Sequence, residues 1–261
     1  MIGLFDSGYG GLTVLKPILK ALPEYDYIYL GDNARAPYGS HSPDNIKKFS
    51  EQAVRYLLDR GAKLIIFACN TASSVALRDI QKKYSKVLGV LIPVAEEASK
   101  VTKGGRVGVI GTNATINSHA YETEIHKLNP GIHVYSKACP LLVPFIEEGW
   151  HEKPEANSIA KKYLQSLKTC HIDTLILGCT HYPMMIKTFR RIMCPRVKIL
   201  ESGDIVATKL KEYLNRHPEI EKTLKKGKKR TFLTTDDPQR FKEFTEKYLG
   251  LKIAPTKISL E

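Results

Sequence analysis

The stretch LIIFACNT, residues 64–71, decides the fold class. Its first part is apolar without polar alternation, which is typical of a strand in a sheet covered on both faces. It ends at Cys69, followed by amide and hydroxyl residues that open a helical pattern. A second stretch, LILGCTH at residues 175–181, repeats the arrangement around Cys179. The recurrence predicts an internal repeat of one fold unit.

Working outward from these stretches, apolar runs alternate with helical patterns along most of the chain. Such alternation predicts parallel β-α-β units. The expected strands cover residues 2–5, 27–31, 63–68, 87–93, 106–110, 132–136, 173–178, 197–202 and 231–235, with one more near the end. The expected helices cover residues 12–22, 43–60, 72–84, 118–128, 154–167 and 204–214, with one more after Asp237. We predict an α/β fold of two similar lobes, residues 1–95 plus 208–261 and residues 96–207, in which the C-terminal segment returns to the first lobe.

The composition excludes several classes of protein. The chain has 261 residues, of which 43% are hydrophobic, and a chain of this size can bury a sufficient core without disulfides or metals. It has no apolar run long enough to span a membrane. The N-terminus MIGLFDSGYGG lacks a basic region and a cleavage site, so we expect a cytoplasmic protein. An odd number of cysteines without a C-x-x-C pair predicts reduced thiols and no zinc site: Cys69, Cys139, Cys170, Cys179 and Cys194.

The formal net charge of +13 raises the question of a polyanionic partner. The densest basic run is Lys222–Arg230, KTLKKGKKR. One interpretation is a solvated helix end and loop, and the other is a patch for nucleic acid or an acidic protein. The run has no interleaved aromatic residues and matches no nucleic-acid-binding motif, which favours the solvated loop.

Polar turns follow four of the predicted strands. In open α/β sheets, ligands bind beyond the carboxyl ends of the strands, and helix N-termini there attract anions. Several such turns in one site suggest a substrate with more than one carboxylate. The turns are Asp6-Ser7, Cys69-Asn70-Thr71, Thr112 with Thr115, and Cys179-Thr180-His181. Neither a dinucleotide fingerprint in register nor a P-loop is found in the sequence.

Cys69 and Cys179 both lie at predicted helix N-termini, where we expect a lowered thiol pKa. Two thiols on related strands could face each other across a cleft, and two opposed acid/base groups are what stereoinversion without a cofactor requires. Other interpretations stay open from the residues alone. Each cysteine could be a small core residue, His181 a core histidine or metal ligand, and Asp6 an N-cap.

Five segments together resemble the aspartate/glutamate racemase family, and within it the glutamate racemases of bacterial cell-wall synthesis. They are Phe5–Val14 (FDSGYGGLTV), Gly31–Ser40 (GDNARAPYGS), Ala68–Ala72 (ACNTA), Gly108–Thr112 (GVIGT) and Leu175–Pro183 (LILGCTHYP). The resemblance implies two Rossmann-like lobes with mostly parallel sheets and an active site in the cleft between them. It implies a two-base racemase that interconverts L- and D-glutamate without cofactor or metal, supplying D-glutamate for peptidoglycan. It also implies a homodimer.

The resemblance assigns roles to individual residues. Cys69 would act on the D-enantiomer and Cys179 on the L-enantiomer, with Asp6 and His181 as their respective proton-handling partners. Glu148 would be an additional catalytic carboxylate, although the adjacent Glu147 fits the motif FIEEG almost as well. The implied substrate-binding residues are Asp6, Ser7, Tyr38, Gly39, Asn70, Thr71, Thr112, Thr115, Thr180 and His181. Tyr9 replaces a residue that is more often small and aliphatic in the family.

Three alternatives remain. Aspartate is shorter than glutamate by one methylene, which typically gives only about 1–3 kcal/mol of discrimination, so an aspartate racemase is the nearest rival. The segments THYP and APYGS favour glutamate. A non-catalytic basic binding protein would lose affinity steeply with salt. A Cys/His metal or redox site lacks a second pair of ligands.

Overall fold

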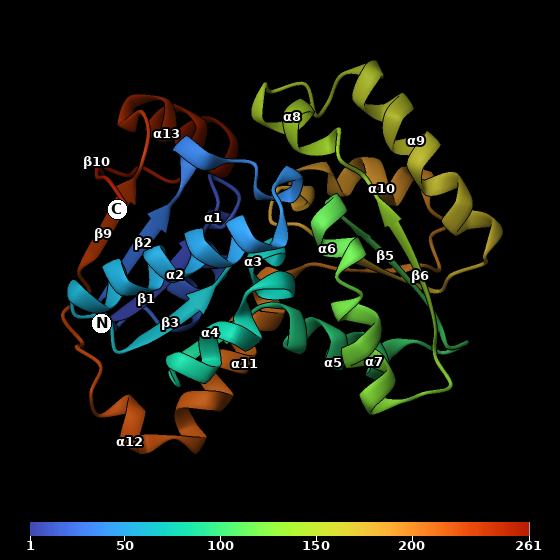
Figure 1. Cartoon of the computed structure of the whole chain (residues 1–261). Helices are drawn as coiled ribbons and strands as arrows, with labels where there is room; N and C mark the ends of the chain where they lie inside the picture. The colour runs from blue at the N-terminus through green and yellow to red at the C-terminus, as the bar shows by residue number, and fades with distance from the viewer. Residues whose placement is uncertain (261) are drawn as a thin grey trace.

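Two parallel sheets form the framework of the computed structural model, which describes residues 1–260 (Figure 1). The first sheet has the strand order β10-β9-β2-β1-β3-β4, with β1 (Ile2–Asp6), β2 (Tyr27–Gly31), β3 (Leu64–Phe67), β4 (Val87–Gly89), β9 (Arg230–Thr234) and β10 (Pro255–Lys257). The second has the order β6-β5-β7-β8, with β5 (Arg106–Gly111), β6 (His133–Ala138), β7 (Thr174–Gly178) and β8 (Lys198–Leu200). The pairs in both sheets are parallel. The predicted α/β class with two parallel sheets is confirmed.

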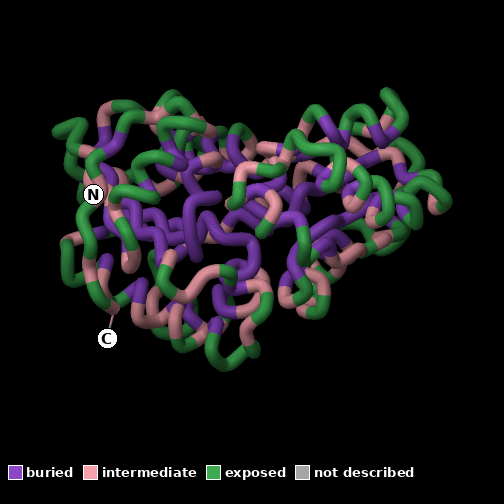
Figure 2. The backbone as a smooth tube through the Cα atoms, turned by 90° about the horizontal axis from the view of Figure 1, so that it is seen from above, coloured by how far each residue is buried: buried purple, intermediate pink, exposed green. Residues whose placement is uncertain are grey.

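Helices cover the faces of both sheets, so that the strand backbone runs through the buried centre of each half (Figure 2). The helices are α1 (Leu12–Ala21), α2 (Pro43–Asp59), α3 (Asn70–Val75), α4 (Leu77–Lys83), α5 (Leu91–Val101), α6 (Asn113–Asn117), α7 (Ala120–Leu128), α8 (Leu142–Glu147), α9 (Pro154–Thr169), α10 (Ile186–Ile192), α11 (Ser202–Arg216), α12 (Pro218–Glu221) and α13 (Pro238–Phe244). Short 3₁₀ segments cover Asn33–Arg35, Tyr38–Ser40 and Tyr182–Met185, and a π-helical turn covers Thr245–Leu249.

Helix α11 packs against both α1 and α5 and thereby joins the two halves (Figure 1). The contact with α1 is so close that Gly203 leaves no room for a side chain, since a Cβ atom there would lie 2.8 Å from the carbonyl oxygen of Thr13. Cys69 follows β3 of the first sheet, and Cys179 follows β7 of the second. The two predicted catalytic cysteines therefore lie at strand ends of different sheets.

Several predicted boundaries need correction. The strand expected over residues 87–93 ends at Gly89, and α5 begins at Leu91. Pro93 lies in the first turn of α5, where its missing N–H is not needed, so it does not break the helix. The helix expected over 72–84 is divided at Ala76. His119, with φ of 53°, separates α7 from the preceding short helix.

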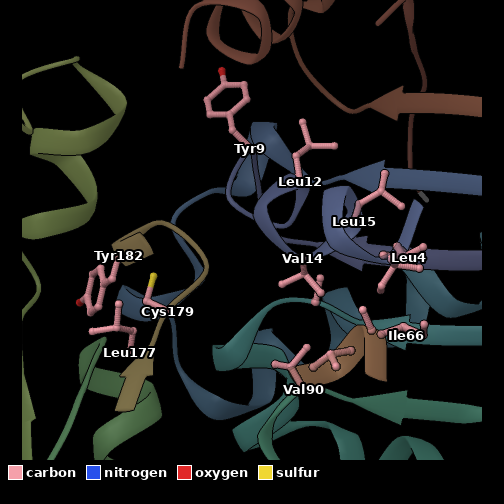
Figure 3. Close-up of a cluster of buried hydrophobic side chains, with 14 of the residues drawn as sticks. Leu4, Tyr9, Leu12, Val14, Leu15, Ile66, Val90, Leu177, Cys179 and Tyr182 are labelled. Atoms are coloured by element: carbon pink, nitrogen blue, oxygen red, sulfur yellow. The ribbon is translucent and has the colours of Figure 1, made fainter. Parts of the chain in front are cut away.

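The C-terminal segment adds to the edge of the first sheet, since β9 pairs with β2 and β10 pairs with β9. Tyr9 connects this segment to the first turn of the chain: its ring stacks on Phe244 at 4.7 Å and lies 5.5 Å from Phe241. Figure 3 shows Tyr9 pointing toward the C-terminal helix and away from Cys179. The exact domain boundaries stay a prediction.

The basic run Lys222–Arg230 covers the loop between α12 and β9 and the first residue of β9. Asp26 accepts hydrogen bonds from the backbone N–H groups of Gly227 and Lys229, both at 2.9 Å. The Arg230 guanidinium donates to the carbonyl oxygens of Pro23 and Tyr25. These contacts support the interpretation as a structural, solvated loop. No helix within residues 1–260 is long and apolar enough to cross a membrane.

Candidate active site

One pocket collects residues from the carboxyl ends of strands in both sheets. Its lining contains ten of the predicted site residues: Ser7, Tyr38, Gly39, Cys69, Asn70, Thr71, Thr112, Cys179, Thr180 and His181. Four residues not assigned to the site from sequence also line it: Ala36, Pro37, Val143 and Glu147. Of these, Glu147 is the alternative to Glu148 that the sequence offers. The other three residues carry no polar side chain that would mark them as site residues. Asp6 and Thr115 are not part of the lining but hydrogen-bond to it, Asp6 to Thr180 and Thr115 to Thr71 and Thr112.

Cys69 is the N-cap of α3, and its side chain is almost completely buried. Its Sγ donates to Ser7 Oγ at 3.5 Å and accepts from the backbone N–H of Ala72 at 3.4 Å. Burial, reinforced by the nearby Asp6 carboxyl, raises the pKa of Cys69 to about 12. The expected lowering by the helix N-terminus is therefore wrong for Cys69, because desolvation outweighs the amides of a short helix. A raised pKa favours the protonated thiol form of Cys69.

Asp6 lies at the end of β1 with no exposed surface. Its carboxyl accepts from the N–H of Gly8 at 2.9 Å and from Thr180 Oγ1 at 3.2 Å. Gly11, not Asp6, is the N-cap of α1, so the N-cap interpretation is wrong. Burial raises the pKa of Asp6, while the charge of His181 opposes the shift. A carboxylate with a raised pKa is a stronger proton acceptor, which suits a base near Cys69.

Cys179 has a different proton partner. Its Sγ lies 3.9 Å from Nδ1 of His181, whose other nitrogen, Nε2, lies 2.9 Å from Oε1 of Glu147. Although burial opposes it, hydrogen bonds to Cys179 and Glu147 raise the pKa of His181 well above its ordinary value. Burial by itself would raise the pKa of Glu147, but the hydrogen bond from His181 lowers it below its ordinary value. His181 and Glu147 therefore form a charged pair beside the second thiol.

The structure corrects the choice between the adjacent glutamates. Glu147 is the last residue of α8 and faces the pocket, whereas the Glu148 side chain is 69% exposed. Glu148 Oε1 accepts from Arg240 at 3.2 Å, outside the pocket. The two positions differ by one step around a helix end, so only one of them can face His181.

A cluster of three hydroxyls joins the halves beside the cysteines. Thr71 Oγ1 lies 2.9 Å from Thr112 Oγ1 and 3.2 Å from Thr115 Oγ1, and the latter two are 3.0 Å apart. Gly39 packs on this cluster, because a Cβ atom there would lie 2.4 Å from Cβ of Thr112. Tyr38 Oη donates to Asp32 at 2.5 Å, so its hydroxyl is engaged by the protein. Hydroxyls, an amide and two thiols in one pocket form a site suited to a small polar anion.

Within residues 1–260, no three His, Cys, Asp or Glu side chains are grouped so that they could hold a metal ion. The polar side chains of the pocket are instead arranged as two separate thiol–partner pairs.

Two parallel sheets with one pocket between their carboxyl ends, and a buried thiol on each side of that pocket, one near Asp6 and one beside His181, define an α/β enzyme of the racemase class. Residues 9–210 match the model of the Asp/Glu/Hydantoin racemase family, so the chain belongs to this family. A glutamate racemase from Geobacter metallireducens is 43% identical, with 100% of this chain and 97% of that protein covered.

Solved structures agree with this assignment. A glutamate racemase isoform from Bacillus anthracis has a TM-score of 0.93 at 36% identity, and the match covers 100% of this chain and 97% of that chain. A glutamate racemase from Francisella tularensis in complex with D-glutamate has a TM-score of 0.91 at 38% identity, with the same coverage. Both have the architecture described here along the whole length of the chain.

Proposed function

We propose that this chain interconverts L- and D-glutamate by proton transfer at the α-carbon and supplies D-glutamate for peptidoglycan in the cytoplasm. The observation that carries the proposal is the placement of Cys69 and Cys179. They come from strand ends of different sheets and line one pocket. His181 Nδ1 lies 3.9 Å from the Cys179 sulfur, and the Asp6 carboxyl is near enough to Cys69 to raise its pKa.

In the L-to-D direction, Cys179 reacts as the thiolate, because His181 holds the proton that came from its thiol. The thiolate takes the α-proton of L-glutamate. The electron pair of the broken C–H bond remains on the substrate as a carbanion. The Cys69 thiol then delivers a proton to the opposite face, which gives D-glutamate and leaves a Cys69 thiolate. One C–H bond is broken and one is formed. Before the next L-to-D turnover, Cys179 releases its proton to water through His181 and Cys69 takes up a proton from water, which restores the starting protonation. Asp6 is placed to accept the proton of Cys69 when D-glutamate is the substrate.

The carbanion is the costly species, so the pocket must stabilise negative charge with groups already in position. Ser7, Thr71 and Thr180 supply hydroxyls and Asn70 supplies an amide. The charged pair of His181 and Glu147 holds a positive charge next to Cys179.

The decisive experiment is proton NMR of the purified protein in D₂O with L- and D-glutamate and then L- and D-aspartate, without added cofactor. We expect loss of the α-proton signal with both glutamate enantiomers, and chiral chromatography to find the opposite enantiomer. Exchange with aspartate alone would move the substrate to the nearest rival. No exchange with any of the four by the folded protein would refute the racemase proposal.

The resemblance also leads us to propose a homodimer. Sedimentation velocity at several protein concentrations would report about twice the chain mass, and a monomer at all concentrations would contradict it.

A further inference from the structure

The amide of Asn70 is incompletely satisfied. Asn70 is the first residue of α3, follows Cys69, lines the pocket and is only 2% exposed. Its Nδ2 is buried and has no hydrogen-bond partner among residues 1–260. Leaving a buried donor unpaired is unfavourable. An unpaired N–H group in a pocket lining therefore points to an acceptor on the ligand.

The other end of the same amide is held from the opposite half of the molecule. Tyr121, on α7, donates its hydroxyl proton to Asn70 Oδ1 at 2.6 Å. Within residues 1–260, the Tyr121 hydroxyl makes no other hydrogen bond. Its ring belongs to the apolar cluster that contains Ile125 and Ile176, where a hydroxyl has no packing role.

Tyr121 also lies against the second thiol's strand. A Cβ atom on Gly178, the residue before Cys179, would lie 3.2 Å from Cε2 of Tyr121. One side chain thus contacts the residue after Cys69 and the residue before Cys179. Helices α7 and α3 are in contact.

We propose that Tyr121 is a positioning residue that fixes the orientation of the Asn70 amide, so that Nδ2 donates to a carboxylate of the bound substrate. This inference rests on the proposed function. The terminal torsion of asparagine is broad and roughly two-fold. An interchanged amide would present its carbonyl oxygen to an anionic substrate and repel it. Because the hydroxyl proton of Tyr121 needs an acceptor, it selects the orientation with Oδ1 turned away from the pocket.

The test is Tyr121→Phe, which keeps the ring and removes the hydroxyl. We expect KM to rise about tenfold for both enantiomers, the factor expected from losing one oriented hydrogen bond. Because the amide contacts substrate in the ground state and the transition state alike, kcat should change by about twofold or less. Tyr27→Phe is the matched control, since this buried hydroxyl donates to Leu22 O at 2.9 Å and Tyr27 is not in the pocket lining.

A double-mutant cycle separates positioning from a general structural effect. In an Asn70→Ala background, Tyr121→Phe should change KM by about twofold or less, because there is no amide left to orient. An equal rise in KM in both backgrounds would overturn the proposal, as would an unchanged KM in the single variant. A structural role of the hydroxyl would act in both backgrounds.

Asn70→Asp provides a second variant in case Tyr121→Phe is unstable. It keeps an acceptor for Tyr121 but replaces the unpaired donor by an oxygen, so KM for both enantiomers should rise by more than about tenfold. An unchanged KM would overturn the proposal. Failure of the wild-type protein to exchange the α-proton would instead refute the proposed function, so the two failures are distinguishable.

Discussion

Nε2 of His181 lies 2.9 Å from Oε1 of Glu147, and this contact links the end of β7 to the end of α8. The Nδ1 atom of the same ring lies 3.9 Å from the Cys179 sulfur. The imidazole therefore lies between the carboxylate and the thiol. The ring can exchange a proton with Cys179 while Glu147 stabilises its charged form.

The first prediction concerns this pair. Glu147→Gln removes the negative charge that stabilises the His181 imidazolium, so kcat/KM should fall. We expect a fall of about 10–100-fold, less than the roughly 10²–10⁴-fold contribution of a group that transfers the proton itself, because Glu147 contacts only the imidazole. The equilibrium constant of racemisation is unity, so the fall must be equal in both directions. Glu148→Gln is the control, since Glu148 is exposed and pairs with Arg240. Chiral assays of both variants make the comparison, and a larger loss in Glu148→Gln would contradict the structure.

The second prediction is a pH-dependent difference in stability between the wild-type protein and Glu147→Gln. The pKa of His181 is raised on folding, so its contribution is full below about pH 6.5 and is lost as pH rises through the folded pKa. The pKa of Glu147 is lowered, so its contribution is present above about pH 4.3 and is lost as pH falls through the folded pKa. The difference should therefore be largest between these limits, on the order of 1–3 kcal/mol. Urea unfolding at several pH values measures it, and a difference independent of pH would count against a charged pair.

The third prediction separates the two thiols. A serine hydroxyl is too weak an acid to replace either thiol, so Cys69→Ser and Cys179→Ser should each lose at least about 10²–10⁴-fold in racemisation. Cys69→Ser should still exchange the α-proton of L-glutamate in D₂O without inversion, since Cys179 remains. Cys179→Ser should do the same with D-glutamate. Cys194→Ser, at an exposed thiol, is the control and should behave as the wild type. Racemisation near the wild-type rate in both pocket variants would exclude the two-thiol mechanism.

The sequence predicts the parts of the fold that depend on local pattern. The runs that became β3 and β7 are buried at every residue, so their continuous apolar character marks them clearly. The strand predicted over residues 87–93 is too long, because a buried strand and the apolar start of a buried helix have the same pattern. Only packing decides that Leu91 begins α5.

The candidate site likewise contains residues that the local sequence predicts and features that only the tertiary structure determines. Cys69 and Cys179 can be found from their positions at strand ends. The choice between Glu147 and Glu148 depends on how α8 meets His181, which no local pattern contains. The raised pKa of Cys69 results from its burial in the folded chain and from the nearby Asp6 carboxyl, so it too is a property of the tertiary structure.

The last prediction tests whether the pocket needs close contact between its two halves at Gly39. A Cβ atom at this position would lie 2.4 Å from Cβ and 2.6 Å from Cγ2 of Thr112, so Gly39→Ala must displace the loop that carries Tyr38. The displacement would open the substrate pocket on this side, and we expect KM to rise at least about tenfold for both enantiomers.

Ser40→Ala in the same loop is the matched control. Its hydroxyl makes only an exposed hydrogen bond to the Pro37 carbonyl at 3.1 Å, so its effect should stay within about twofold. Steady-state kinetics of both variants, with thermal unfolding to confirm that they are folded, makes the comparison. A wild-type KM in Gly39→Ala would mean that the contact between Gly39 and Thr112 is dispensable, and that substrate is held by the strand-end residues alone.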